Sequence, residues 1–194
     1  LHADHVVSHA NSVMGLVESF VGVVPAGGGC KEMLYRWTEK LNDTQKGAWK
    51  SFMNIGLGRK ANSPQEADAL AMRRADDVFQ MNRDRILNIA LSKLDDTKKA
   101  SQRSPLALSG AEHFKEMLEW LEVNNKKGML TPHDVTVGTE IGRIMSGGDC
   151  PAGTVFSEQE ILDAERSSFI TLAQTQETQA RIVSMLDNGV TLRN

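Results

Sequence analysis

The stretch GLVESFVGVVPAGGG, residues 15–29, decides how the N-terminal part of this chain is interpreted. Glu18 interrupts an otherwise apolar run, which ends at Pro25 and three consecutive glycines. β-branched residues dominate residues 1–29 and favour strand structure, in which Glu18 would share a face with Leu16 and Phe20. Two interpretations stay open. Glu18 is either an exposed residue on a mixed strand or a carboxylate in an apolar pocket that can hold or deliver a proton.

Composition excludes several classes of protein. The 194 residues include 22 basic and 25 acidic side chains, which leaves no basic surface typical of nucleic-acid binding. No apolar stretch approaches the roughly 20 residues that span a bilayer, and the first residues lack the basic region of a signal peptide. We therefore expect a cytoplasmic protein. Cys30 and Cys150 favour a reducing compartment, and a single bridge between them stays open.

Apolar spacing after Gly29 predicts helices for most of the chain. Further helix starts are expected at Ser63, Ser109, Thr131 and Ser157. A last helix, near residues 177–188, would present Ile182, Val183, Met185 and Leu186 and end at Gly189. The predicted fold class is mainly α with a short β-rich N-terminal segment, divided into residues 1–93, a loop at 94–108 and a helical region at 109–194. So short a β segment cannot form a stable sheet alone.

Two other clusters suggest cofactor sites, and local context argues against both. His2, His5 and His9 would align on a helix, but the surrounding residues favour a strand, so no metal site is predicted. Residues 56–61, GLGRKA, match a dinucleotide-binding pattern. That pattern needs a strand before it and a long helix after it, whereas a new element begins at Ser63. No NAD site is predicted in this chain.

A nucleophilic site at Cys30 is also weakly supported. A thiol at the start of a helix favours the thiolate, and His133 could act as its base. Nothing in the sequence ties these two residues together. A small core thiol and a residue near a helix N-terminus are the preferred interpretations.

Several motifs follow one another in a recognisable order. The segment Gly15–Glu18 precedes Gly22, Pro25 and the three glycines. Further segments are His2–Asp4, Asp76–Arg85, Thr131–Asp134, Gly147–Asp149 and Leu162–Asn194. Together they resemble the crotonase superfamily, and most closely the enoyl-CoA hydratase part of long bacterial 3-hydroxyacyl-CoA dehydrogenases. The resemblance covers nearly the whole chain and implies the C-terminal portion of a crotonase fold, a ClpP-like α/β spiral.

This resemblance implies a role for each matching residue. Crotonases hydrate trans-2-enoyl thioesters with two glutamates, and Glu18 matches the second. In the family that residue exchanges the proton at C2 and helps to hold the water that attacks C3. The matching substrate-binding residues are Gly15, Pro25, Gly27 and Gly28, which would form the wall of the acyl pocket. The implied partner is an acyl-CoA substrate in fatty-acid β-oxidation. No cofactor is expected in this chain, and NAD only in an upstream dehydrogenase domain.

The first glutamate and the oxyanion-hole segments of the family have no counterpart here and are expected before Leu1. We therefore expect the isolated chain to lack hydratase activity. We also expect a homo-oligomer or contact with the rest of a parent protein. Two alternatives stay open. Residues 109–194 could serve as a non-catalytic assembly module, because crotonases commonly associate through C-terminal helices, or the single carboxylate could serve an enoyl-CoA isomerase.

Overall fold

A computed structural model describes residues 1–96 and 102–194, and its contacts divide the chain into two compact units. Unit 1 comprises residues 1–15 and 60–102, and unit 2 comprises residues 16–59 and 103–194. This grouping differs from the expected division at residues 94–108, because residues 16–59 belong with the C-terminal helices. Residues 97–101 of that expected loop lie outside the described residues.

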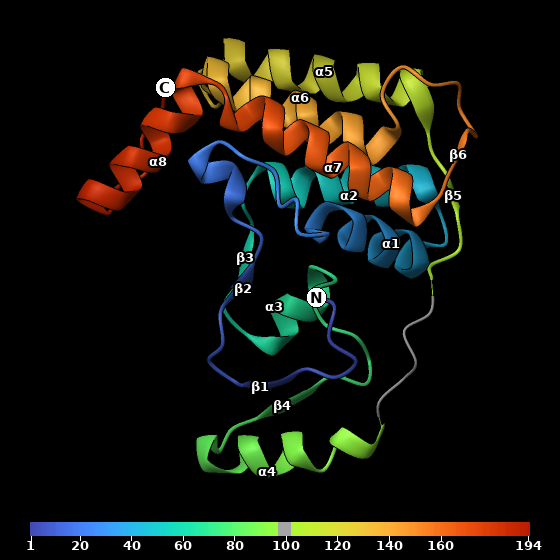
Figure 1. The fold of residues 1–194 in the computed structure, drawn as a ribbon, viewed down its shortest axis with the longest axis vertical. Coiled ribbons are helices and arrows are strands. Elements are labelled where there is room, and N and C mark those ends of the chain that lie inside the picture. Colours follow the sequence, from blue (N-terminus) through green and yellow to red (C-terminus); the bar gives the residue numbers. More distant parts are fainter. Residues whose placement is uncertain (97–101) are drawn as a thin grey trace. The chain divides into compact units, whose positions relative to one another are not determined.

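Unit 1 contains short strands and short helices (Figure 1). Its elements are β1 (Val7–His9), β2 (Met14–Gly15), β3 (Lys60–Ala61), α3 (Pro64–Ala69), β4 (Val78–Gln80), η2 (Arg83–Arg85), α4 (Ile86–Leu91) and η3 (Leu94–Asp96). β1 pairs in parallel with β4, with Val7 opposite Val78, and β2 pairs antiparallel with β3. The buried carboxylate of Asp77 accepts hydrogen bonds from the backbone N–H groups of Val6 and Arg74, which fixes the start of β4 beside β1.

Unit 2 is helical. Its elements are η1 (Glu18–Val21), α1 (Gly29–Leu41), α2 (Thr44–Gly56), β5 (Leu106–Ala107), α5 (Gly110–Lys126), α6 (Pro132–Ser146), β6 (Val155–Phe156), α7 (Glu158–Ala173) and α8 (Gln176–Asn188). α6 lies at the centre and contacts α1, α2, α5 and α7 (Figure 1). The predicted inner face of α6, formed by Val137, Ile141, Ile144 and Met145, is fully buried. Each such side chain contributes about 1.5–3 kcal/mol on leaving water.

Helix starts follow the sequence with one exception. At α7, Ser157 accepts from the N–H of Glu160 while the Glu160 side chain accepts from the N–H of Ser157, a complete capping box. α3 likewise begins directly after Ser63. The box predicted at Ser109 is wrong: its hydroxyl lies 2.7 Å from Nδ1 of His113 and caps no backbone group. A side-chain partner one turn away has replaced the backbone N–H.

The strand predicted through residues 1–29 is wrong from residue 16 onward. Glu18 begins a 3₁₀ helix, so it does not alternate with Leu16 and Phe20 as strand residues would. β propensity describes fit to a half-buried sheet surface, and here the apolar side chains pack against helices. Gly22 ends this turn with a φ of 84°, a left-handed conformation that a strand does not contain.

The apolar face of α8 is only partly buried. Val183 and Leu186 are 55% and 78% exposed, and Ile182 and Met185 are half-buried. α8 instead packs through polar residues of its first half, Thr178 and Arg181, and projects from the end of α7 (Figure 1). Among the helices that the structure describes, none combines the length and apolar composition that a bilayer crossing requires.

A network of charges on α1 joins three segments of unit 2. Glu32 is 2% exposed and accepts from Arg103 at 2.8 Å, and it also faces Lys31 and Arg36. Lys31 binds Glu158, the first residue of α7, at 2.7 Å. Burial raises the pKa of a carboxyl group, but the three cations prevail and lower the pKa of Glu32 to about 2. Arg103, where the chain returns to unit 2, is thereby held against α1.

This network predicts a specific loss of stability in acid. Because the folded pKa of Glu32 lies below its usual 4.5, its stabilisation is present above about pH 4.5 and is lost as the pH falls towards 2. Glu32→Gln should cost about 3 kcal/mol near neutrality, since it removes the buried carboxylate that Lys31, Arg36 and Arg103 share. The difference from the wild type, measured by urea unfolding, should shrink between about pH 4.5 and about pH 2.

The matched control is Glu39→Gln, which removes the exposed carboxylate that also binds Arg103. Exposed pairs contribute at most about 1 kcal/mol, so this variant should unfold almost like the wild type. A Glu32→Gln difference that stays constant across that pH range would contradict the assigned pKa.

Candidate functional site

Glu18 opens η1, and its carboxylate is the unusual feature of this turn. The side chain is half-buried, and its Oε2 atom is shielded from solvent without a hydrogen-bond partner among the described residues. A buried carboxylate oxygen that accepts no hydrogen bond is costly. Such an exception in a folded protein calls for an explanation, which can be strain, a catalytic role, or a water molecule or ion at the site. Glu18 therefore lies in a half-enclosed position with one oxygen that accepts no hydrogen bond from the described residues.

Side chains from distant helices hold η1 in place. The Ser19 hydroxyl donates to the carbonyl of Ile55 near the end of α2, at 2.9 Å. The Arg181 guanidinium donates to the carbonyl of Ser19 at 3.4 Å, and the Thr178 hydroxyl donates to the carbonyl of Gly22 at 2.8 Å. Glu18 is thus carried by a turn whose two ends are fixed from α2 and α8.

Gly22 has a double constraint. Its φ of 84° is left-handed, and a Cβ atom built there would lie 2.6 Å from the hydroxyl oxygen of Thr178. That hydroxyl also lies 2.8 Å from Nε2 of His133. Burial and then Arg181 lower the pKa of His133, so the imidazole is neutral near pH 7. Because Thr178 gives its only proton to Gly22, Nε2 of His133 must donate to Thr178. His133 therefore supports η1 through Thr178, and none of these contacts links it to the Cys30 thiol.

The turn after η1 leads into the N-terminus of α1. Gly28 caps this helix with a φ of 86° and has no side chain to accept from the first N–H groups. Glu165 of α7, which is 0% exposed, takes that role. Its Oε2 accepts from the N–H of Gly28 at 2.9 Å, and its Oε1 accepts from the N–H of Lys31. Sequence analysis missed Glu165; the glycine at the cap of a buried helix was the available signal that an outside acceptor is needed.

The charges of Glu165 and Glu18 both act on the Cys30 thiol. It is fully buried, and its pKa is raised by burial, then by Glu165 and then by Glu18. A thiol with a raised pKa is inert. The preferred interpretation of Cys30 as a core residue agrees with this environment. Both cysteines are free thiols in the structure, so they form no bridge.

The predicted substrate-binding residues differ in their surroundings. Gly15 ends β2 in unit 1, opposite Lys60, whereas the other three belong to unit 2. Pro25 is buried, and its carbonyl accepts from the N–H groups of Gly29 and Cys30. Gly27 is exposed, and a Cβ atom built there meets nothing within 4 Å. A ligand can therefore approach the backbone of Gly27 closely. Their role in substrate binding stays a prediction.

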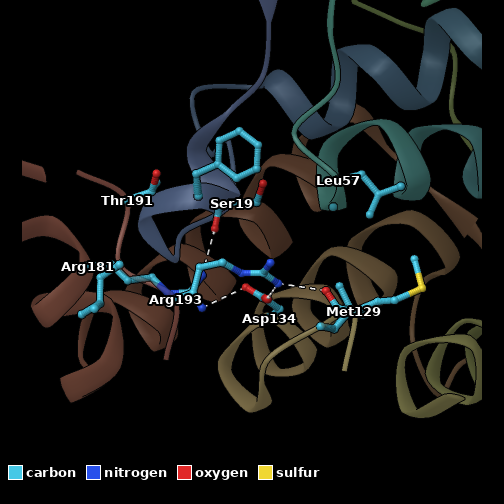
Figure 2. Close-up of a pocket in the computed structure, with 11 residues that line it drawn as sticks. Ser19, Leu57, Met129, Asp134, Arg181, Thr191 and Arg193 are labelled. Carbon is cyan, nitrogen blue, oxygen red and sulfur yellow. Dashed lines mark hydrogen bonds and ion pairs between the residues drawn. The ribbon is translucent and has the colours of Figure 1, made fainter. Parts of the chain in front are cut away.

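A pocket of about 340 Å³ adjoins η1 in unit 2 (Figure 2). Its apolar lining is formed by Phe20, Leu57, Met129, Leu130 and Leu192. Its polar lining is an ion cluster in which Asp134 binds Arg181 at 2.8 Å and Arg193 at 3.1 Å. Arg181 is 2% exposed and also binds Thr131 and Asn194, so it anchors α8 and the segment after it. The pocket shares η1 with Glu18 through Ser19 and Phe20.

The structure does not provide the geometry of a dinucleotide site at residues 56–61. Gly56 is the last residue of α2, so a helix rather than a strand precedes the pattern. A Cβ atom at Gly58 would lie 2.5 Å from the Phe20 ring, so a side chain occupies this position. The helix that follows, α3, has only six residues. Within residues 1–96 and 102–194, no group of three or more His, Cys, Asp or Glu side chains is arranged to hold a metal ion.

These contacts predict unequal effects on stability for alanine substitutions at Gly22 and Gly27. Gly22→Ala should destabilise the protein by about 2 kcal/mol or more, because it combines a left-handed φ with the Thr178 clash. Gly27→Ala should change the stability by no more than about 0.5 kcal/mol, because its Cβ meets open space. Urea unfolding of both variants measures the difference. Equal stabilities would contradict the proposed packing of α8 on η1.

Comparison with known proteins gives one informative relative. The chain is 29% identical over 198 residues to a protein of Bacillus subtilis (strain 168) described as a probable 3-hydroxyacyl-CoA dehydrogenase. The match includes the whole of this chain, which spans about a quarter, 25%, of the relative's length. No protein-family model matches the chain, and no solved structure matches it. The chain is therefore similar to part of a probable 3-hydroxyacyl-CoA dehydrogenase.

Proposed function

We propose that residues 1–194 act in an enzyme of fatty-acid β-oxidation that hydrates enoyl-CoA thioesters, with Glu18 as an acid–base residue. The observation that carries the proposal is the shielded, unpartnered oxygen of Glu18 on a turn fixed from α2 and α8. Similarity along the entire chain to a probable 3-hydroxyacyl-CoA dehydrogenase supports the class of substrate. Both lines of support involve the segment that resembles the crotonase motif.

The proposed reaction adds water across the 2,3 double bond of the thioester. The hydroxyl group joins C3 as a base removes the second proton of the water, and C2 receives a proton from an acid. We assign to Glu18 the proton at C2 and a hydrogen bond to the attacking water, because such transfers need a side chain that can hold a proton within hydrogen-bond reach, and a carboxyl group can do so. The exposed backbone at Gly27 is the proposed wall for the acyl group.

Glu165 does not fit the role of the second catalytic carboxylate, because both of its oxygens accept backbone N–H groups. We also propose that residues 56–61 bind no dinucleotide, since they lack the preceding strand and the long following helix that such binding uses. The chain's own contribution is thus one acid–base group and one wall of the acyl site.

Glu18→Gln tests this proposal in the complete natural protein that contains residues 1–194. An amide cannot transfer the proton, so kcat for hydration of an enoyl-CoA substrate should fall by about 100-fold or more. KM should change little, because the variant keeps the size and shape of the side chain. Loss of the enoyl-thioester absorbance measures the rate.

Glu122→Gln, at an exposed position on α5, is the matched control and should keep wild-type kinetics. A Glu18→Gln enzyme within about twofold of the wild-type kcat would refute the acid–base role. The product distinguishes hydration from double-bond isomerisation, since supply of a 3-enoyl thioester yields a 2-enoyl product only if the same carboxylate serves an isomerase.

A second candidate function, assembly, is favoured by the exposed apolar residues of α8. Val183 and Leu186 are largely solvent-accessible, and α7 adds Phe169 and Ile170 at 40% and 46% exposure. Burial of such side chains between copies would contribute about 1.5–3 kcal/mol each. The proposal is a homo-oligomer whose contact includes α8.

If α8 forms this contact, the double variant Val183→Ser, Leu186→Gln should raise the dissociation constant of the oligomer by about tenfold or more per residue. Light scattering over a concentration series measures it. Val123→Ser, at a half-exposed position on α5, serves as the control. A wild-type protein that stays monomeric at high concentration would refute assembly, and catalysis that survives Glu18→Gln would leave assembly as the better account.

A further inference from the structure

We propose that Glu165 is a positioning residue that sets the backbone geometry of residues 25–28 for the acyl thioester, and that loss of its negative charge weakens acyl-CoA binding. The inference rests on the proposed function, because it treats this turn as the wall of the acyl site. Glu165 lies in the sequence 137 residues after Gly28 and matches no motif of the family resemblance that concerns catalysis. The proposal therefore adds to the site a positioning residue whose charge affects substrate binding.

The geometry gives Glu165 control of the turn. One of its oxygens binds the N–H group of Gly28, the residue before α1, and the other binds the N–H group of Lys31, the third residue of α1. The carbonyl of Pro25 accepts from Gly29 and Cys30, which closes the same turn from the other direction. A carboxylate at a helix N-terminus also interacts favourably with the helix dipole. The position of the exposed Gly27 backbone between these contacts therefore depends on Glu165.

The contact requires the ionised carboxylate. Two oxygens that both accept N–H groups suit a negative charge, and such charge-assisted hydrogen bonds are about twice as strong as neutral ones. A protonated carboxyl group keeps one good acceptor and places an O–H donor where the second N–H lies. Burial raises the pKa of Glu165 to about 7, although the N–H groups of Lys31 and Gly28 and the Lys31 charge lower it. The turn is thus poised to change near neutral pH.

The neighbouring groups leave the backbone as the main partner of Glu165. From α1, the ammonium group of Lys31 is within electrostatic range, but it makes its ion pairs with Glu32 and Glu158. The Cys30 thiol, also on α1, is neutral because its pKa is raised. From α6, the Glu140 carboxylate reaches α7 by accepting from Ser168. No cation in these contacts neutralises Glu165 directly.

The experiment uses the complete natural protein and compares the wild type with Glu165→Gln from about pH 5.5 to about pH 8.5. The wild-type KM for an acyl-CoA substrate should rise as the pH falls through about 7, while kcat changes less. Glu165→Gln should raise KM by about tenfold at the alkaline end. It should also abolish the pH dependence of KM, which a merely structural role would leave in place.

Asp163→Asn, an exposed carboxylate on the same helix, is the matched control and should keep the wild-type pH profile. A Glu165→Gln enzyme with the wild-type KM and pH profile would overturn the inference. If that variant fails to fold, hydrogen exchange at the amides of Gly28 and Lys31 in the wild type decides. Protection that falls in step with the rise in KM supports the proposal, and constant protection overturns it.

Different results would refute the proposed function and the positioning role of Glu165. A wild-type protein that neither binds nor converts acyl-CoA refutes the proposed function, whatever Glu165 does. In that case the exchange of the Gly28 and Lys31 amides still shows whether the Glu165 carboxylate holds the turn. A wild-type protein that converts acyl-CoA with a KM independent of pH refutes only the role of Glu165.

Discussion

Backbone groups at two glycines must be satisfied by side chains from far along the chain, and the arrangement of unit 2 depends on this constraint. Gly22 ends η1 and Gly28 caps α1, and neither has a side chain that can bind its own polar groups. Thr178 binds the carbonyl of Gly22, and Glu165 binds the N–H of Gly28. Buried backbone groups without partners are costly. α7 and α8 are therefore tied to the segment that carries Glu18.

The backbone carbonyls of Ser19 and Gly22, which follow Glu18, accept hydrogen bonds from side chains of α8. The Oε2 atom of Glu18 differs from them, because it has no hydrogen-bond partner among the described residues. Ser19, directly beside it, binds Ile55 through its hydroxyl and Arg181 through its carbonyl. A turn fixed in this way keeps a carboxylate in one position, which proton transfer requires. The hydrogen bonds from η1 to α2 and α8 offset the free-energy cost of leaving one carboxylate oxygen without a partner.

The helical part was predictable because its signals are local. Ser157 and Glu160 cap α7 from positions three residues apart, and the apolar spacing of α6 predicts its buried face. The site was predictable only in part. Glu18 was singled out through its place in a resembling motif, and its catalytic role stays a prediction. Its 3₁₀ conformation depends on contacts with α2 and α8, which local β propensity does not register. Glu165 is 137 residues from Gly28, a separation at which no periodicity carries information.

The two carboxylates that influence Cys30 have different surroundings. Glu165 and Glu18 both raise the pKa of the Cys30 thiol. Glu165 is held by backbone N–H groups at the positive end of α1, whereas one oxygen of Glu18 has no partner. The N-terminus of α1 thus binds both oxygens of Glu165, while Oε2 of Glu18 stays without a hydrogen-bond partner among the described residues.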